Sequence, residues 1–313
     1  MRAVAFHDGD VRVGDHPDPQ PGAGEILVRV RAAGLNGADL MQLGGHYPAP
    51  PGWPKDIPGL ELAGEVAALG DGATRFALGD RVMAVVGGGG QAELAVVHER
   101  AAMPVPEGLS WPEAGGVPEV FATAHDGLFT QAGLAPGERL LVHGGAGGVG
   151  TAAVQLGRTA GARVTATVRR PELRGEVERL GARVIEPEGF GEHGPWDVVL
   201  ELVGAPNVPE DLAALAPLGR LLVIGVGAGA RTEVDLRVLM AGRLRVLGST
   251  MRARPLEGKA DMTRRLERHV LPLFDSGDLR VPVAARFGLE EAPAAYERFR
   301  EGGKLGKVVL VLA

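Results

Sequence analysis

Hydrophobic and polar positions follow two different patterns along this chain. In the first hundred residues, short apolar or alternating runs are separated by segments rich in Gly and Pro, as strands are separated by turns. These runs lie at residues 25–30, 64–69, 81–86 and 92–97. Regularly spaced short strands of this kind predict a closed or partly closed β structure.

The pattern changes near Ser110, where Ser110 is followed three residues later by Glu113, with Pro112 between them. That spacing predicts the start of a helix, and a further helix is expected over 118–131. Strands and helices then alternate. The expected strands lie at 139–143, 163–168, 183–185, 197–202, 220–224 and 244–247, and the expected helices at 150–159, 171–180, 208–215 and 236–241.

These later strands are nearly continuous apolar runs, which is typical of a parallel sheet covered on both faces. Six such strands with intervening helices predict a doubly wound, dinucleotide-binding Rossmann fold of the α/β class. An amphipathic helix over 259–276 follows, then a strand at 281–287, a short helix at 292–300 and a final strand at 307–312. We expect this last stretch to return to the first domain.

The length of 313 residues suggests two domains. The expected division is 1–113 for the first part of a β domain, 114–275 for the nucleotide-binding domain and 276–313 for the return. A formal net charge of −6 argues against a general nucleic-acid binder. There is no apolar run long enough to cross a bilayer and no signal-peptide pattern after Met1, so a cytoplasmic location is expected.

The most informative motif is the segment from Val142 to Gly150, which reads VHGGAGGVG. It places Gly145, Gly147 and Gly150 in a G-x-G-x-x-G pattern between a strand and a helix. The first glycine permits a tight turn, the second lets the backbone approach a pyrophosphate, and the third allows close packing of helix and strand. The free N–H groups of the helix would bind the phosphates. We therefore expect Gly145, Ala146, Gly147, Gly148 and Val149 to contact the cofactor.

The second strand of this fold indicates which nicotinamide cofactor binds. An NAD site usually has Asp or Glu at its end, about 20 residues after the glycines. Here that position holds Arg169, followed by Arg170, with Thr167 just before them. Two guanidinium groups suit a 2′-phosphate, and the Thr167 hydroxyl could add a contact. Glu172 falls inside the following helix. The sequence therefore favours NADPH over NADH.

Together with further segments, these motifs resemble those of the medium-chain dehydrogenases/reductases, and in particular of the zinc-free quinone oxidoreductase branch, the zeta-crystallin-like enzymes. The resemblance runs nearly end to end. It rests on the glycine loop and on the segments 34–40, 58–64, 79–82, 90–93, 123–124 and 306–309. It implies a GroES-like β domain, built from both ends of the chain, together with the Rossmann domain. It also implies cofactor contacts from Thr123, Gly225 and Lys307.

The zinc-dependent relatives hold a catalytic metal through a cysteine near Asn36, a His-Glu pair near Leu60 and Glu61, and a further Cys or Asp. This chain has no cysteine, Asn36 stands in place of the thiol, and Leu60 in place of the histidine. Catalytic zinc usually needs three protein ligands. We therefore expect no metal.

In this branch a tyrosine follows in a Gly-x-Tyr-Pro context, which here is Gly45 to Pro48. The resemblance implies that Tyr47 binds the substrate carbonyl or donates a proton, and that Asn36 positions the carbonyl or the nicotinamide ribose. Packing remains an alternative for Tyr47, turn capping for Asn36, and backbone bonding is expected for Asp39. His46 is read as a solvated neighbour.

The function implied is hydride transfer from NADPH to a quinone or an α,β-unsaturated carbonyl. Two alternatives stay open. One is an enoyl-thioester reductase, for which Arg252 and Arg254 could bind coenzyme A phosphates. The other is an NADPH-binding protein with little activity. The resemblance also implies a homodimer paired through the last Rossmann strand, near 244–247, which would cover an exposed strand edge.

Overall fold

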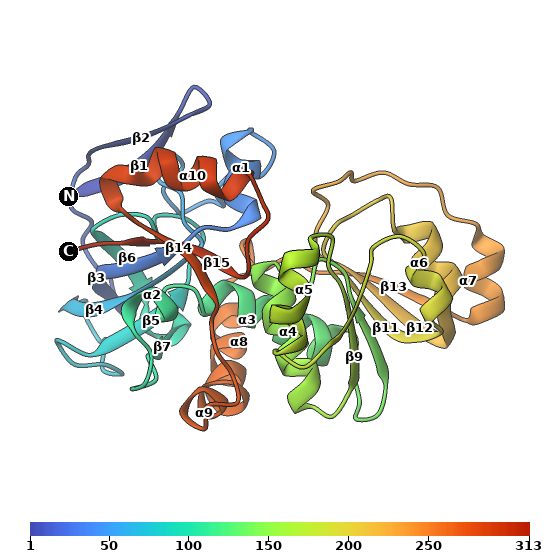
Figure 1. The fold of residues 1–313 in the computed structure, drawn as a ribbon. Helices are drawn as coiled ribbons and strands as arrows, with labels where there is room; N and C mark the ends of the chain where they lie inside the picture. Colours follow the sequence, from blue (N-terminus) through green and yellow to red (C-terminus); the bar gives the residue numbers. More distant parts are fainter. The chain divides into compact units, whose positions relative to one another are not determined.

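The computed structural model describes residues 1–313, and the chain forms two compact units. The first contains Met1–Ala122, Met251–Gly302 and Lys307–Ala313, and the second contains Thr123–Thr250 and Gly303–Gly306. Both ends of the chain therefore belong to the first unit, as Figure 1 shows. Each unit has its own sheet and is described by itself.

The second unit is built on a six-stranded parallel sheet in the order β10-β9-β8-β11-β12-β13. The strands are β8 (Arg139–Val142), β9 (Arg163–Thr167), β10 (Arg183–Ile185), β11 (Trp196–Glu201), β12 (Leu215–Val223) and β13 (Arg245–Gly248). Counted from β8, this is the 3-2-1-4-5-6 order of a dinucleotide-binding fold. The predicted Rossmann sheet is confirmed.

Helices cover this sheet because each turns its apolar stripe toward the strands. Helix α4 (Gly148–Thr159) packs on β8 and β9, and α5 (Pro171–Glu178) on β10. Helix α6 (Val208–Ala214) packs on β11 and β12, and α7 (Leu236–Gly242) on β12. The middle strands are fully buried, with Leu140, Leu141 and Val142 completely inaccessible. The near-continuous apolar runs of the sequence thus follow from burial on both faces.

The first unit is built on a mixed, mostly antiparallel sheet. Its strand order is β14-β15-β3-β4-β5-β7, with β6 also paired to β3. The strands are β3 (Glu25–Gly34), β4 (Glu61–Leu69), β5 (Arg81–Val85), β6 (Leu94–His98), β7 (Ala102–Pro104), β14 (Val283–Gly288) and β15 (Lys307–Val311). A separate hairpin joins β1 (Arg2–His7) to β2 (Asp10–Asp15).

The last strand of the chain pairs antiparallel with β3, so the expected return of the tail to the first domain is confirmed. Helix α10 (Ala292–Arg300) lies beside β2, β14 and β15 (Figure 1). Its Tyr296 is buried in the core and donates a hydrogen bond from its hydroxyl to Gln91 Oε1 at 2.9 Å. Both chain ends therefore contribute to one core.

The units divide the chain differently from the boundaries expected at 113 and 275. Residues 251–275, expected in the nucleotide-binding domain, pack with the first unit. Helix α8 (Leu256–His269) contacts the η1 turn (Glu99–Ala101) and β7, and Thr263 Oγ1 donates to Ala101 O at 3.3 Å. The sequence pattern showed an amphipathic helix there but not which sheet its apolar face covers.

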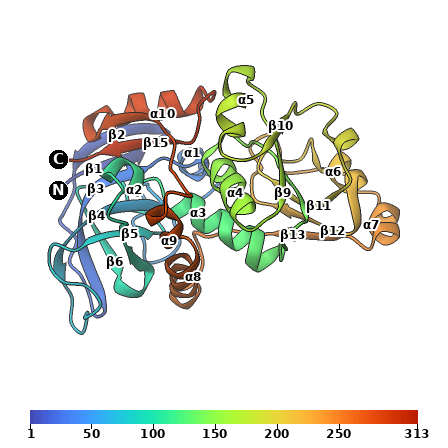
Figure 2. The same cartoon turned by 60° about the horizontal axis from the view of Figure 1, so that its bottom comes forward.

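Two expected helices are each divided in the structure. The segment 259–276 is α8 followed by α9 (Leu271–Asp275), which lie side by side in Figure 2. Pro272 lies in the first turn of the second helix, where proline is accepted, whereas the interior of one continuous helix would not accept it. The segment 118–131 is α3 (Pro118–His125) followed by a π-helical turn (Asp126–Gln131). The short helices α1 (Gly37–Leu43) and α2 (Trp111–Ala114) complete the first unit.

The predicted helix start at Ser110 is confirmed, since its N–H donates to Glu113 Oε2 at 2.9 Å. No helix of the structure combines the length and the apolar character needed to span a bilayer. The expected cytoplasmic location stays a prediction.

Candidate functional site

The glycine loop joins β8 to α4 in the second unit, and its geometry requires glycine. A Cβ on Gly150 would lie 2.3 Å from Gly144 O, and one on Gly145 would lie 2.7 Å from the Ala166 side chain. Gly147 is the N-cap of α4 and therefore contributes no capping side chain. The first intrahelical bond is Thr151 N to Gly147 O at 2.8 Å, so the N–H groups before Thr151 have no helical acceptor. This loop fits the phosphates of a dinucleotide.

A buried polar cluster beneath the loop fixes its position. His143, the last residue before the glycines, is 1% exposed. Its Nδ1 lies 3.1 Å from Thr167 Oγ1 and its Nε2 lies 2.9 Å from Asp211 Oδ1. Thr167 Oγ1 also accepts a hydrogen bond from Gly144 N at 3.2 Å. The Thr167 hydroxyl, proposed above as a phosphate ligand, is therefore already engaged in holding the loop.

Two acidic side chains complete this cluster. Burial raises the pKa of Asp211 to about 6, and the bond to His143 opposes that rise. Glu201 is fully buried, and its carboxylate accepts from Val203 N, from Gly204 N at 2.7 Å and from Asn207 Nδ2 at 2.9 Å. The ligand atoms of His143, Glu201 and Asp211 all lie within 4.8 Å of one another. Since these groups bond one another and the backbone, we assign the cluster to loop support.

The two arginines follow β9 as expected, and both are exposed. Arg170 Nη1 lies 3.4 Å from Glu172 Oε1, and Glu172 sits in the first turn of α5. Arg169 has no hydrogen bond or ion pair within the chain. No carboxylate stands at the end of β9 itself, where a ribose 2′-hydroxyl would be bound.

A segment near the C-terminus also lies at the glycine loop, which sequence reasoning missed. Gly306 N donates to Ala146 O at 2.8 Å, and Gly147 and Gly306 form an isolated parallel bridge. A Cβ on Gly303 would lie 2.2 Å from Arg170 Nε. Residues 303–306 therefore close one side of the loop and position Arg170.

Two further predicted cofactor residues belong to the second unit. Thr123 lies in α3 and is 6% exposed. Gly225 follows β12, and a Cβ there would lie 2.2 Å from Leu202 O. The close approach of the Leu202 backbone is therefore sufficient to require glycine at position 225.

The first unit holds a second polar cluster, centred on Lys307. Its Nζ donates to Leu35 O at 2.7 Å and to Asn36 Oδ1 at 2.8 Å, and it lies 2.6 Å from Glu61 Oε1. Asn36 Nδ2 donates to the same Glu61 oxygen at 2.9 Å. Lys307 is 3% exposed and Glu61 is fully buried. Lys307, predicted to contact the cofactor, thus sits in a buried ion pair.

This cluster also tests whether a metal could bind where zinc-dependent relatives hold one. Leu60 offers no ligand atom, and the Asn36 and Glu61 oxygens already face the Lys307 ammonium. A divalent cation there would be opposed by that charge and would lack the three ligands it needs. The residues present do not fit a catalytic metal.

Asp39 has the backbone role expected from the sequence. Its carboxylate accepts from Asn36 N at 2.8 Å and from Gly59 N at 3.3 Å. Burial raises its pKa to about 6, against these bonds and the positive charge of Lys307. Asp39 therefore links α1 to the segment that precedes β4.

Arg252 holds the loop that carries Tyr47. Its guanidinium donates to Gly87 O at 2.8 Å, to Tyr47 O at 2.5 Å and to Gln42 Oε1 at 2.6 Å. The Arg252 side chain also lies over the Tyr47 ring, 5.2 Å from its centroid. With three acceptors and 2% exposure, Arg252 is not free to bind a phosphate, so the coenzyme A role considered for it is not supported.

The Tyr47 side chain is half-buried, and its hydroxyl has no partner within the chain. Burial raises its pKa, and the negative charge of Glu119 adds to that rise. Tyr47 is therefore a neutral donor with an unused O–H. His46 beside it is exposed, as expected.

Two ionisable side chains that sequence reasoning missed belong to this part of the first unit. Glu119 lies in the first turn of α3, and its Oε2 atom is buried without a hydrogen-bond partner. Lys259 of α8 is 4% exposed, and its Nζ lies 4.5 Å from the centroid of the Trp53 ring. Nothing in the sequence pattern separated them from ordinary surface charges.

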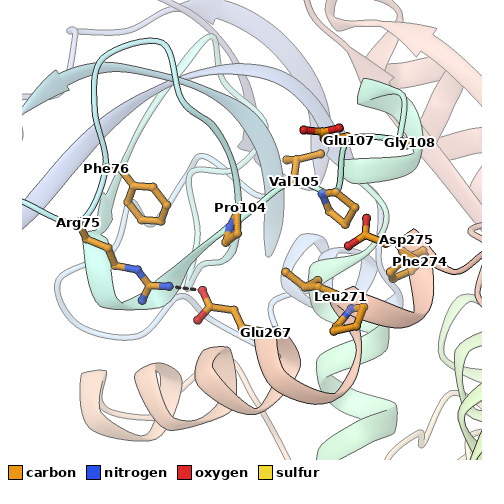
Figure 3. Close-up of a pocket in the computed structure, with 12 residues that line it drawn as sticks. Arg75, Phe76, Pro104, Val105, Glu107, Gly108, Glu267, Leu271, Phe274 and Asp275 are labelled. Carbon is orange, nitrogen blue, oxygen red and sulfur yellow. Dashed lines mark hydrogen bonds and ion pairs between the residues drawn. The ribbon is translucent and has the colours of Figure 1, made fainter.

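The first unit also has a hollow of about 930 Å³ that is lined by residues outside these polar clusters (Figure 3). Phe76, Pro104 and Leu271 line it, and an ion pair between Arg75 and Glu267 crosses one end. None of the candidate site residues described above lines this hollow, so we assign it no part in the chemistry.

Comparison with known families agrees with both units. The family model of the alcohol dehydrogenase GroES-like domain matches residues 22–107, and that of the zinc-binding dehydrogenases matches residues 185–310. A quinone oxidoreductase of Pseudomonas aeruginosa is 34% identical, with 95% of this chain and 94% of the relative covered. An acryloyl-coenzyme A reductase of Metallosphaera sedula is 32% identical, with 99% of both chains covered.

Solved structures show the same architecture. An alcohol dehydrogenase superfamily protein from Novosphingobium aromaticivorans superposes with a TM-score of 0.89 at 28% identity, and both chains are covered completely. A mycobacterial protein solved in complex with NADPH superposes with a TM-score of 0.88 at 28% identity, covering 99% of this chain and all of that one.

Proposed function

The chain belongs to the medium-chain dehydrogenase/reductase superfamily of oxidoreductases, and we propose that it is a zinc-independent reductase that uses NADPH. Its acceptor is a small quinone or an α,β-unsaturated carbonyl compound. The observation that carries this proposal is the end of β9, where two exposed arginines stand in place of the carboxylate of an NAD site. The NADPH complex of a similar protein and the name of the Pseudomonas relative support it.

Bound NADPH would supply a hydride from its nicotinamide ring. The glycine loop and the first turn of α4 would hold the pyrophosphate, and Arg169 and Arg170 the 2′-phosphate. Thr123 would contact the nicotinamide region. In the first unit, the free Tyr47 hydroxyl would donate a hydrogen bond to the acceptor's carbonyl oxygen, where negative charge develops. Asn36, tied to Glu61 and Lys307, would act as a positioning residue.

An acceptor screen tests this proposal directly. NADPH consumption is followed with a quinone, a simple enone and a crotonyl thioester, in parallel with NADH. Turnover of the quinone or the enone with NADPH preferred supports it. If NADPH is not consumed with any acceptor, or if activity depends on added zinc, the proposal is wrong. Preference for the thioester would favour the second candidate, an enoyl-thioester reductase, which the Metallosphaera relative's name suggests.

Replacing Tyr47 by phenylalanine should lower kcat about tenfold, because one hydrogen bond to the developing anion is worth roughly that factor. The Kd for NADPH should stay within twofold. Steady-state kinetics and a binding titration on the same preparation check both expectations. A kcat equal to that of the wild type would remove Tyr47 from the mechanism.

We also propose that the protein is a homodimer that pairs through β13. That strand is at the edge of its sheet and is bonded only to β12. Its Val246 is 49% exposed, and Met240 of the neighbouring helix α7 is 77% exposed. An open edge with apolar side chains beside it favours pairing with a second copy. Sedimentation of the wild type and of Val246→Lys tests this.

A further inference from the structure

Glu119 has a buried carboxyl atom that no protein group satisfies. Its backbone N–H donates to Glu61 Oε2 at 2.9 Å, but its own Oε2 atom has no partner. A buried polar atom without a partner costs free energy and needs an explanation. Because Glu119 lies in the first turn of α3 and Thr123 in the second, their spacing of four residues places both on one face of that helix.

The charges around Glu119 come from several elements of the first unit. They are Glu61 of β4, Lys307 of β15, Asp39 of α1, Lys259 of α8, Tyr47 and Arg252. Burial and, to a lesser extent, the charge of Glu61 raise the pKa of Glu119 to about 8, while the charge of Lys307 opposes the rise. Glu119 therefore carries a proton at neutral pH and is ionised above about pH 8.

Lys259 has a matching property. Burial lowers the pKa of its ammonium to about 8, while the charge of Glu119 opposes that change. The Nζ has only the face of Trp53 beside it and no hydrogen-bond acceptor in the chain. The Glu119 carboxyl and the Lys259 amine therefore have nearly equal pKa values. A proton can pass from one group to the other at little cost in free energy.

On this basis, and resting on the function proposed above, we propose that Glu119 is the acid that completes the reduction and that Lys259 reloads it. After hydride transfer the acceptor is an enolate or a hydroquinone anion. The O–H bond at Glu119 Oε2 breaks, and a C–H or O–H bond forms on the acceptor. The Glu119 carboxylate then takes a proton from the Lys259 ammonium, and water reprotonates the amine. Each turnover consumes one hydride and one proton.

Glu119→Gln is a sharp test because glutamine matches the shape and neutrality of a protonated glutamate but cannot release a proton. With a 2-methyl enone, the wild type should give one configuration at the new α-carbon centre. The variant should lower kcat about tenfold and give both configurations, since water then protonates either face. The matched control is Glu178→Gln, at an exposed position of α5, which should behave as the wild type.

The pH profile is a second readout, and it also serves if only quinones are reduced. Wild-type kcat should fall tenfold per pH unit above about 8, as Glu119 loses its proton, and the Glu119→Gln profile should be flat there. Lys259→Met should leave the first turnover unchanged and slow the later ones, because it affects only reloading.

Unchanged kcat and product configuration in Glu119→Gln, with NADPH still bound, would overturn the inference while leaving the proposed function intact. A wild type that reduces no acceptor with NADPH would instead remove the proposed function itself. A Lys259→Met variant that is slow in its first turnover would also overturn the reloading role.

Discussion

Replacing Arg169 and Arg170 together by alanine should raise the Kd for NADPH about 100-fold. Both side chains are exposed at the end of β9. A charge-assisted hydrogen bond contributes about 1.5 kcal/mol or more, and two such bonds amount to roughly a factor of 100 in affinity. The Kd for NADH should stay within about twofold, because NADH lacks the 2′-phosphate. Titration of both cofactors against the purified double variant measures these changes.

A suitable control is Arg179→Ala, which removes an exposed arginine from the end of α5 in the same unit. It changes the net charge without touching the loop, so it should leave both constants nearly unchanged. Equal weakening of NADPH and NADH in the double variant would show that the arginines support the loop. An unchanged Kd for NADPH would place the 2′-phosphate elsewhere.

The Arg170 side chain is held by neighbours that could not be recognised from the sequence. The Cβ-free backbone of Gly303 lies against the Arg170 guanidinium, and Glu172 pairs with it. Part of the cost of ordering that side chain is therefore already met before a ligand binds. Arg169 has no such support, so Arg170→Ala alone should account for more than half of the loss.

Much of the second unit could be predicted because its signals are local. The apolar runs, the spacing of the three glycines and the residues after β9 are all read within about 30 residues of sequence. Their physical reasons, burial on both sheet faces and close backbone approach at Gly145 and Gly150, leave direct marks on residue type.

The polar clusters could not be predicted, because their members come from distant segments. Glu61, Glu119 and Lys307 meet only after β4, α3 and β15 have packed. Lys259 is an ordinary charged residue on an amphipathic helix until its side chain is found 4% exposed against Trp53. The sequence resemblance pointed to Lys307 as a cofactor residue, yet it could not show the buried pair with Glu61.

That pair leads to the second large effect: Lys307→Met should lower the free energy of unfolding by about 3–5 kcal/mol. The substitution keeps the length and packing of the aliphatic chain but leaves Glu61 as a buried, uncompensated carboxylate, and breaking a buried pair in this way costs about that much. Glu61 is fully buried and already lies close enough to Glu119 to raise that residue's pKa. Chemical denaturation of wild type and variant measures the difference.

The double variant Glu61→Gln with Lys307→Met separates the charge from the packing. With both charges of the pair removed, it should be more stable than Lys307→Met alone, although it lacks the same ion pair. Lys55→Met, which removes an exposed lysine of the same unit, should change stability by less than about 0.5 kcal/mol. A Lys307→Met protein as stable as the wild type would mean that the ammonium gives Glu61 no net stabilisation. If that variant then failed to bind NADPH, the main role of Lys307 would be to bind the cofactor and not to stabilise the fold.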